Sequence, residues 1–93
     1  MPVGLLEVRL RLPGVKTLKE KRSVVAGVLA GARRAYGVSA AELASLDDPK
    51  VAVLGFAHLS NDGRYTDEVL MSLLDELGGS RDYYVEGHQL SFL

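Results

Sequence analysis

The spacing of apolar residues switches between strand-like and helix-like periods along this chain, and the order of these switches constrains the fold most. From 3 to 12, apolar and polar residues alternate, and this period-two pattern predicts a strand with one buried face. From 17 to 36 and from 63 to 77, the apolar residues recur at helical spacing instead. Three further strands are predicted at 38–46, where a bulge is expected, at 50–59 and at 82–92.

Capping residues mark the ends of both predicted helices. Thr17 and Glu20 form a capping box, in which the threonine hydroxyl accepts from the Glu20 amide and the glutamate reaches back to the Thr17 amide. Gly37 fits the left-handed position that ends a helix. Residues 60–63 supply turn and N-cap chemistry for the second helix, and Gly78-Gly79 ends it.

The predicted order is strand, helix, strand, strand, helix, strand, without a linker or a repeat. Split βαβ units in this order form a ferredoxin-like α+β sandwich, a four-stranded antiparallel sheet with two helices on one face. We therefore predict one domain over residues 1–93, a length that supports a single core. The first and third strands should be central and the helices antiparallel neighbours. The second face of the sheet should be open to water or to a partner.

The amino-acid composition excludes several kinds of functional site. The 93 residues include no cysteine, which removes disulfides, thiolate catalysis and cysteine metal sites. His58 should be a core-edge residue with one hydrogen-bond partner and His88 an exposed one, so neither a metal nor another cofactor is expected. No apolar run approaches the ~18 residues of a membrane span, and the N-terminus lacks a signal-peptide pattern. We therefore expect a cytoplasmic protein without a membrane partner.

The charge is unevenly distributed, although the formal net charge is only −1. Residues 1–46 carry eight Lys/Arg and three Asp/Glu, a balance of +5, whereas residues 47–93 carry three Lys/Arg and nine Asp/Glu, a balance of −6. On the predicted fold, the basic excess lies mainly on the first helix and much of the acidic excess on the second. The two neighbouring helices should therefore be oppositely charged.

The start of the first predicted helix, Thr17-Leu18-Lys19-Glu20-Lys21-Arg22, resembles a known family. It is similar to the YlxP-like family (domain of unknown function 503) of small bacterial proteins, and the resemblance extends without a gap from Leu5 to Asp62. Further matching segments are Tyr36-Gly37-Val38-Ser39 with Glu42, Leu54-Gly55, and Ser60-Asn61-Asp62. The resemblance implies a ferredoxin-like fold and no defined activity. Because genes of the family often lie beside those of translation initiation and ribosome maturation factors, it also implies an association with RNA or a ribosomal particle.

One segment departs from the pattern of this family. Many members carry an aspartate followed two residues later by Trp-Gln between the second and third strands. Here Asp47 is kept, while Pro49 and Lys50 occupy the Trp and Gln positions. A function that depends on that tryptophan is therefore not expected to transfer to this chain.

The first candidate site is a basic edge along the first helix. Cations in the first turn oppose the helix dipole at a cost of roughly 0.3–1 kcal/mol each, so one interpretation is that an RNA phosphate compensates them. Lys21 should project beside the buried stripe, toward the turn after the first strand. The candidate phosphate-binding residues are Lys16, Lys19, Lys21, Arg22, Arg33 and Arg34.

The alternative interpretation of this basic edge is neutralisation within the domain. If the helices are antiparallel, Asp75 and Glu76 lie near the basic start of the first helix, and Arg33 and Arg34 face the acids at 67–68. Exposed pairs of this kind contribute about 0–1 kcal/mol each. This interpretation therefore explains the arrangement of charge more than the stability of the fold.

The second candidate site is the open sheet face, which suits a protein partner or a second copy of the chain. RNA recognition on such a sheet stacks bases on aromatic side chains of the central strands, and none is predicted there because Phe56 should face the helices. The remaining interpretation is an ordinary, partly wetted sheet. The candidate interface residues are Leu5, Arg9, Arg11, Val51, Val53 and Leu59.

A third candidate is a pair of glycines in the first helix. Gly27 and Gly31 are spaced for close approach of another chain and are predicted opposite the buried stripe. Each mid-helix glycine costs about 1 kcal/mol relative to alanine, which such a contact could offset. The alternative is a tolerant surface with no partner.

Catalysis is not expected from this sequence, because it contains no motif for a catalytic triad, a P-loop or a dinucleotide site. Acylphosphatases share the predicted fold and use an arginine in the first turn with an asparagine from the third strand. Here the first turn is Pro13-Gly14-Val15-Lys16, and Asn61 is predicted at the opposite end of the sheet. The parts of such a site would not meet.

Overall fold

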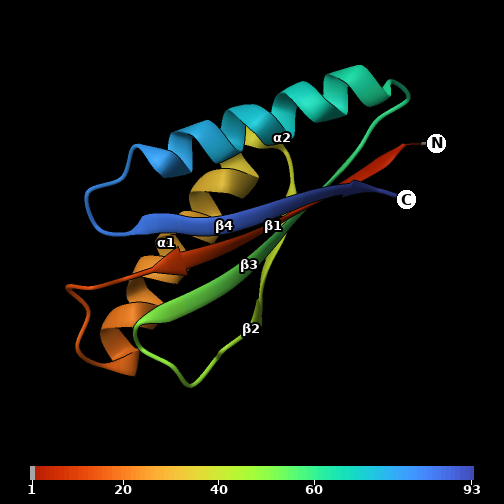
Figure 1. Ribbon diagram of the computed structural model, residues 1–93. Helices are drawn as coiled ribbons and strands as arrows, with labels where there is room; N and C mark the ends of the chain where they lie inside the picture. The colour runs from red at the N-terminus through yellow and green to blue at the C-terminus, as the bar shows by residue number, and fades with distance from the viewer. Residues whose placement is uncertain (1) are drawn as a thin grey trace.

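The computed structural model, which describes residues 2–93, confirms the ferredoxin-like α+β fold. Two helices lie against one face of a four-stranded antiparallel sheet, and the strands are ordered β2-β3-β1-β4 (Figure 1). The elements are β1 (Val3–Arg11), α1 (Leu18–Tyr36), β2 (Ser39–Ala44), β3 (Val51–Leu59), α2 (Gly63–Gly78) and β4 (Tyr84–Phe92). As predicted, the central strands are β1 and β3. Among the described residues, no helix is long and apolar enough to span a membrane.

The alternation in β1 separates the two faces of the sheet. Leu6, Val8 and Leu10 are at most 1% exposed and belong to the core between sheet and helices. The residues between them face the other side, where they pair across the ladder with alternate residues of β3. Phe56 is fully buried in the core, as predicted from its phase in β3.

The start of α1 differs in one hydrogen bond from the predicted capping box. The Thr17 hydroxyl accepts from the Glu20 amide at 3.1 Å, as expected. The Glu20 carboxylate accepts from the Lys16 amide at 3.2 Å, one residue before the predicted partner. At the other end, Gly37 has φ 63° and donates to the Arg33 carbonyl, so the predicted glycine cap is confirmed.

The helix α2 lies very close to β1. A Cβ atom at Gly4 would stand 2.6 Å from Thr66 Cγ2 and 2.7 Å from Leu70 Cδ1, nearer than carbon atoms can approach. A side chain at this position would therefore force Thr66 or Leu70 to shift in the packed layer between α2 and the sheet. The Asp62 carboxylate caps α2 by accepting from the Arg64 amide at 3.0 Å.

Two bulges shape the edges of the sheet. The β2–β3 register shifts between Glu42 and Ala44, which confirms the bulge expected in this strand and leaves Leu43 as the extra residue. The β1–β4 register shifts between Arg9 and Leu10, and the extra residue is Glu86 on β4. Each bulge redirects one side chain, and both of these side chains lie on the open face of the sheet.

Candidate functional sites

The structure divides the six basic candidates of α1 into buried and exposed residues. Lys21 is fully buried, and its ammonium group donates to the Ser45 carbonyl at 2.6 Å. Lys21 Nζ also lies 2.9 Å from Glu42 Oε2, so the two side chains form an ion pair. Among the described residues, this carboxylate oxygen accepts no hydrogen bond. The prediction that Lys21 contacts a phosphate is wrong, because the side chain is enclosed. It reaches the bulged end of β2 and not the turn after β1.

Arg33 is engaged within the domain as well. Its guanidinium donates to the Ala40 carbonyl at 2.6 Å and ties the end of α1 to the start of β2. The predicted contact of Arg33 and Arg34 with the acids at 67–68 is not found among the described residues, where no ion pair joins them. Arg34 remains exposed.

Lys16, Lys19 and Arg22 are exposed around the start of α1. The predicted neutralisation by Asp75 and Glu76 is absent, since the ion pairs of residues 2–93 include none of these cations. Glu76 instead accepts from the Tyr36 hydroxyl at 3.1 Å. Desolvation and this hydrogen bond raise the pKa of Tyr36.

Another segment that carries the family resemblance, Ser60-Asn61-Asp62, has a structural role at the start of α2. The buried Thr66 hydroxyl lies 2.7 Å from the Ser60 hydroxyl and 2.9 Å from Nδ1 of His58. The Ser60 hydroxyl also donates to the Asp62 carbonyl at 2.7 Å. His58 is 8% exposed, so its predicted place at the core edge with a hydrogen-bond partner is confirmed.

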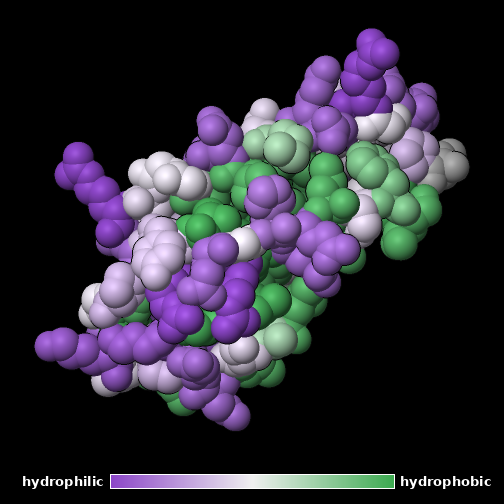
Figure 2. Space-filling view, in the orientation of Figure 1, coloured by the Kyte–Doolittle hydropathy of each residue, from purple (hydrophilic) through white to green (hydrophobic). Residues whose placement is uncertain are grey.

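The open face of the sheet has an apolar half and a charged half. The apolar half lies over β2 and β3, where Ala41, Gly55, Val53 and Ala57 lie across the sheet from the outward side chains of β1. The charged half lies over β1 and β4. Apolar side chains gather along the sheet toward the end that holds the termini, and hydrophilic ones gather toward the opposite end (Figure 2).

The arginines of this face are paired with one carboxylate. Glu86 accepts from Arg9 Nε at 2.7 Å and from Arg11 Nε at 2.9 Å. These hydrogen bonds, Arg11 first, hold the pKa of Glu86 below its ordinary value, and the same contact raises the pKa of Arg11. Two cations therefore share a single counter-charge.

The predicted interface residues are mostly accessible on this face. Leu59 is 63% exposed, and Leu5 and Val53 are half-buried. Val51 is 2% exposed and offers no contact surface, so its prediction as an interface residue is wrong. Sequence reasoning missed Leu43, which is 49% exposed and lies over Gly55. The bulge in β2 was predictable, but its direction was not.

Two shallow hollows indent the open face. One, of about 210 Å³, is apolar and is lined by Leu5, Ser39, Ala40, Ala41, Leu43, Gly55 and Ala57. The other, of about 290 Å³, is lined by Glu7, Val8, Arg9, Val53, Gly87, His88 and Gln89. His88 is exposed, as predicted. The open face therefore has one apolar hollow, mostly over β2 and β3, and one hollow mostly over β1 and β4 whose lining includes charged residues.

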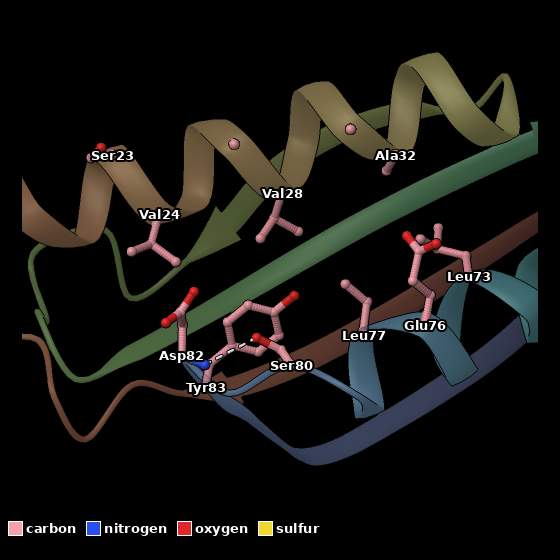
Figure 3. A pocket seen from close by; sticks show the side chains of 12 residues that line it. Ser23, Val24, Val28, Ala32, Leu73, Glu76, Leu77, Ser80, Asp82 and Tyr83 are labelled. Atoms are coloured by element: carbon pink, nitrogen blue, oxygen red, sulfur yellow. Dashed lines mark hydrogen bonds between the residues drawn. The ribbon is translucent and has the colours of Figure 1, made fainter.

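A groove of about 400 Å³ separates the middle of α1 from the end of α2. Val24 and Val28 point into it from α1, and Leu77 points into it from α2 (Figure 3). Gly27 and Gly31 line this groove away from the buried stripe of α1, and Gly27 is exposed while Gly31 is half-buried. A Cβ atom at either glycine would meet nothing within 4 Å.

The described residues do not assemble a metal cluster, because no group of three His, Asp or Glu side chains could hold an ion. The β1–β3 register pairs Val3 with Leu59 and Arg11 with Val51. Asn61, which follows Leu59, therefore lies at the opposite end of the sheet from the first turn, as predicted.

Comparison with known proteins gives a family and little else. A family described as "Protein of unknown function (DUF503)" matches residues 3–89. No curated protein matches the sequence. Among solved structures, an amidase of the hydantoinase/carbamoylase family from Burkholderia phymatum is similar over 98% of this chain and 28% of that chain, with 18% identity and a TM-score of 0.49. This chain spans less than a third of that protein, and a likeness at this level carries no argument about function.

Proposed function

This chain belongs to the DUF503 family of proteins of unknown function, and we propose that it is a protein-association module whose open sheet face is the contact surface. The proposal assigns the chain a binding role and no reaction. One observation carries it: the sheet face without helices exposes an apolar half over β2 and β3, beside arginines that are already paired with Glu86.

The chemistry of this face favours a protein over a nucleic acid. The central strands place no aromatic side chain on it, so bases would have nothing to stack on there. The charges of Glu7, Arg9, Arg11 and Glu86 cancel, so the face offers no excess positive charge to a polyanion. Exposed apolar side chains such as Leu43 and Leu59 gain most from burial against another apolar surface.

The test is a comparison of captured partners. We expect tagged protein to retain specific proteins from nuclease-treated native extract, and the Val53→Glu variant to lose them, because a charge would be buried in the contact. Met71→Glu is the matched control, since Met71 is an exposed apolar residue of α2 on the helix side. Equal retention by wild type and Val53→Glu would contradict the proposal.

The basic start of α1 supports a second candidate function, contact with a phosphate backbone of RNA or a ribosomal particle. The observation in its favour is that Lys16, Lys19 and Arg22 are exposed and that no ion pair in residues 2–93 includes them. Three cations at one helix start attract phosphate by charge and read no sequence. Of the six original candidates, Lys21 is excluded from this role because its side chain is enclosed, and Arg33 already donates one hydrogen bond to the Ala40 carbonyl.

Filter retention with single-stranded RNA at ~50 mM salt tests this second function. Affinity should fall with salt, and Lys19→Glu combined with Arg22→Glu should reduce the slope of log K against log salt by about 1.4, because two phosphate contacts to a single strand are lost. The control is Arg64→Glu, on the N-terminal turn of α2. Absence of retention at this salt concentration would exclude the phosphate contact.

A further inference from the structure

The residues in the middle of the open face are arranged in two neighbouring rows across the strands. One row holds Ala41 of β2, Gly55 of β3 and Glu7 of β1, which are paired in the ladders. The next row holds Val53 and Arg9, with the bulge residue Leu43 beside them. Each row therefore runs from an apolar side chain at β2 to a charged one at β1.

The charges of these rows are not matched within one copy. Arg9 and Arg11 share the single carboxylate of Glu86. Glu7 is half-buried on the same face, and the ion pairs of residues 2–93 do not include it. One copy therefore presents one surplus guanidinium charge and one unmatched carboxylate, two residues apart on β1.

The apolar side chains of the open face also remain uncovered within one copy. Leu43 is 49% exposed over Gly55. Its side chain lines the apolar hollow of about 210 Å³ together with Ser39, Ala41 and Ala57. The exposed leucine side chain therefore lies over the row of Gly55, and the hollow extends from there toward Leu5 and Ala57.

We propose that a second copy of this chain covers the open sheet face, about a two-fold axis that runs across the strands and passes between Glu7 and Arg9 of β1. This inference rests on the proposed function and names its partner. Rotation about such an axis places each row on the other row of the second copy. Glu7 then faces Arg9 of the second copy and Arg9 faces Glu7, while each Leu43, whose side chain lies over Gly55, faces the row of Val53 in the other copy.

The distribution of charge selects this axis over the other one that brings the two faces together. An axis parallel to the strands would lay the β2–β3 half on the β1–β4 half and bury apolar side chains against charged ones. The axis across the strands lays the β2–β3 half on itself and sets Glu7 beside Arg9 with opposite signs, while Leu5 lies against the aliphatic part of Arg11. Isologous contacts require this kind of self-complementary surface, and stacked sheets pack about 10 Å apart, within reach of the Glu7 and Arg9 side chains.

A charge-reversal pair tests the axis directly on the purified full chain. Glu7→Arg alone brings two guanidinium groups together across the axis, and Arg9→Glu alone brings two carboxylates together. Light scattering should show that each variant self-associates at least about tenfold more weakly than wild type. An equimolar mixture of the two variants should recover a dimer, since all of its cross-contacts join opposite charges.

The apolar contact is tested with a matched pair of leucines. Leu43 and Leu46 are similarly exposed, at 49% and 54%, but Leu46 lies beyond β2 in the turn to β3. Leu43→Asp should give a monomer and Leu46→Asp should leave the dimer unchanged. Circular dichroism and a cooperative urea transition for each variant separate loss of contact from loss of folding.

The outcomes are distinct from those of the proposed function. A wild-type dimer, two weakened single variants and a restored mixture support the two-fold axis. A wild-type monomer at millimolar concentration, or a mixture no more dimeric than its components, overturns it. If the wild type is a monomer and Val53→Glu still loses proteins from extract, the open face binds a different protein and only this inference fails.

Discussion

The sheet carries an ion-pair cluster on each of its faces, and the two clusters differ in almost every respect except charge. On the helix side, Lys21 is 0% exposed and contacts Glu42 and the Ser45 carbonyl. On the open side, the side chains of Arg9 and Glu86 are 47% and 32% exposed. The first cluster joins α1 to the end of β2, whereas the second joins neighbouring strands at a surface.

A basic motif in the sequence therefore need not act as one binding site. Lys19, Lys21 and Arg22 are close together in the sequence and look like one basic cluster. Lys21 is enclosed, and its charge is matched within the domain, while Lys19 and Arg22 face water. A buried pair fixes the position of two elements because an unmatched buried charge is costly. The exposed charges remain available to a partner.

We expect the greatest loss of stability from removal of the buried cation. Lys21→Ala should lower the free energy of unfolding by about 3–5 kcal/mol, because Glu42 would be left without its partner. Urea denaturation at neutral pH measures this loss. Lys19→Ala is the matched control and should change the stability by less than about 0.5 kcal/mol.

A double variant sharpens this test. Lys21→Met with Glu42→Leu removes both charges, and it should recover much of the stability lost in Lys21→Ala. Recovery would show that the cost arises from an unmatched carboxylate. A loss below about 1 kcal/mol in Lys21→Ala would contradict a tightly enclosed pair.

The next effect compares a glycine on each face. Gly4→Ala should destabilise the fold by about 1–3 kcal/mol, because its Cβ would overlap Thr66 and Leu70 in the packed layer between sheet and helix. Gly55→Ala is the counterpart on the open face, where the new Cβ would meet only the half-exposed Leu43 side chain. Because Leu43 can swing toward water, Gly55→Ala should cost less than Gly4→Ala. Thermal or urea unfolding measures the loss of stability in each variant. A larger loss in Gly55→Ala than in Gly4→Ala would contradict the proposed difference in packing.

We expect the least change in stability from the exposed ion pairs of Glu86 with Arg9 and Arg11, and this change depends on pH. Arg11 and Arg9 lower the pKa of Glu86 from its ordinary value of 4.5, so the ionised form is favoured in the folded state. Its contribution to stability is present above that ordinary value and is lost as the pH falls through the folded-state pKa. The difference in urea midpoint between wild type and Glu86→Gln should therefore be small at pH 7 and shrink as the pH falls below the ordinary value of 4.5. A difference that grows on acidification would contradict this assignment.

Much of the fold followed from patterns that are local in the sequence. The alternation in Val3–Arg11, the threonine cap at Thr17 and the glycine at Gly37 fixed the type and limits of the first two elements. The candidate sites were less predictable, because they depend on contacts between distant residues. Glu42 and Ser45 lie more than 20 positions from Lys21, and the carboxylate that pairs Arg9 and Arg11 belongs to the last strand.

Local sequence patterns are sufficient to specify the order of the elements and the face that each strand buries, because period and capping act between near neighbours. Which charged side chains find partners within the domain depends on the tertiary structure. It enclosed Lys21, tied Arg33 to β2 and paired two arginines with Glu86, because these partners meet only when the sheet is assembled. It also turned Leu43 outward at the bulge, a direction that depends on the register of β2 on β3.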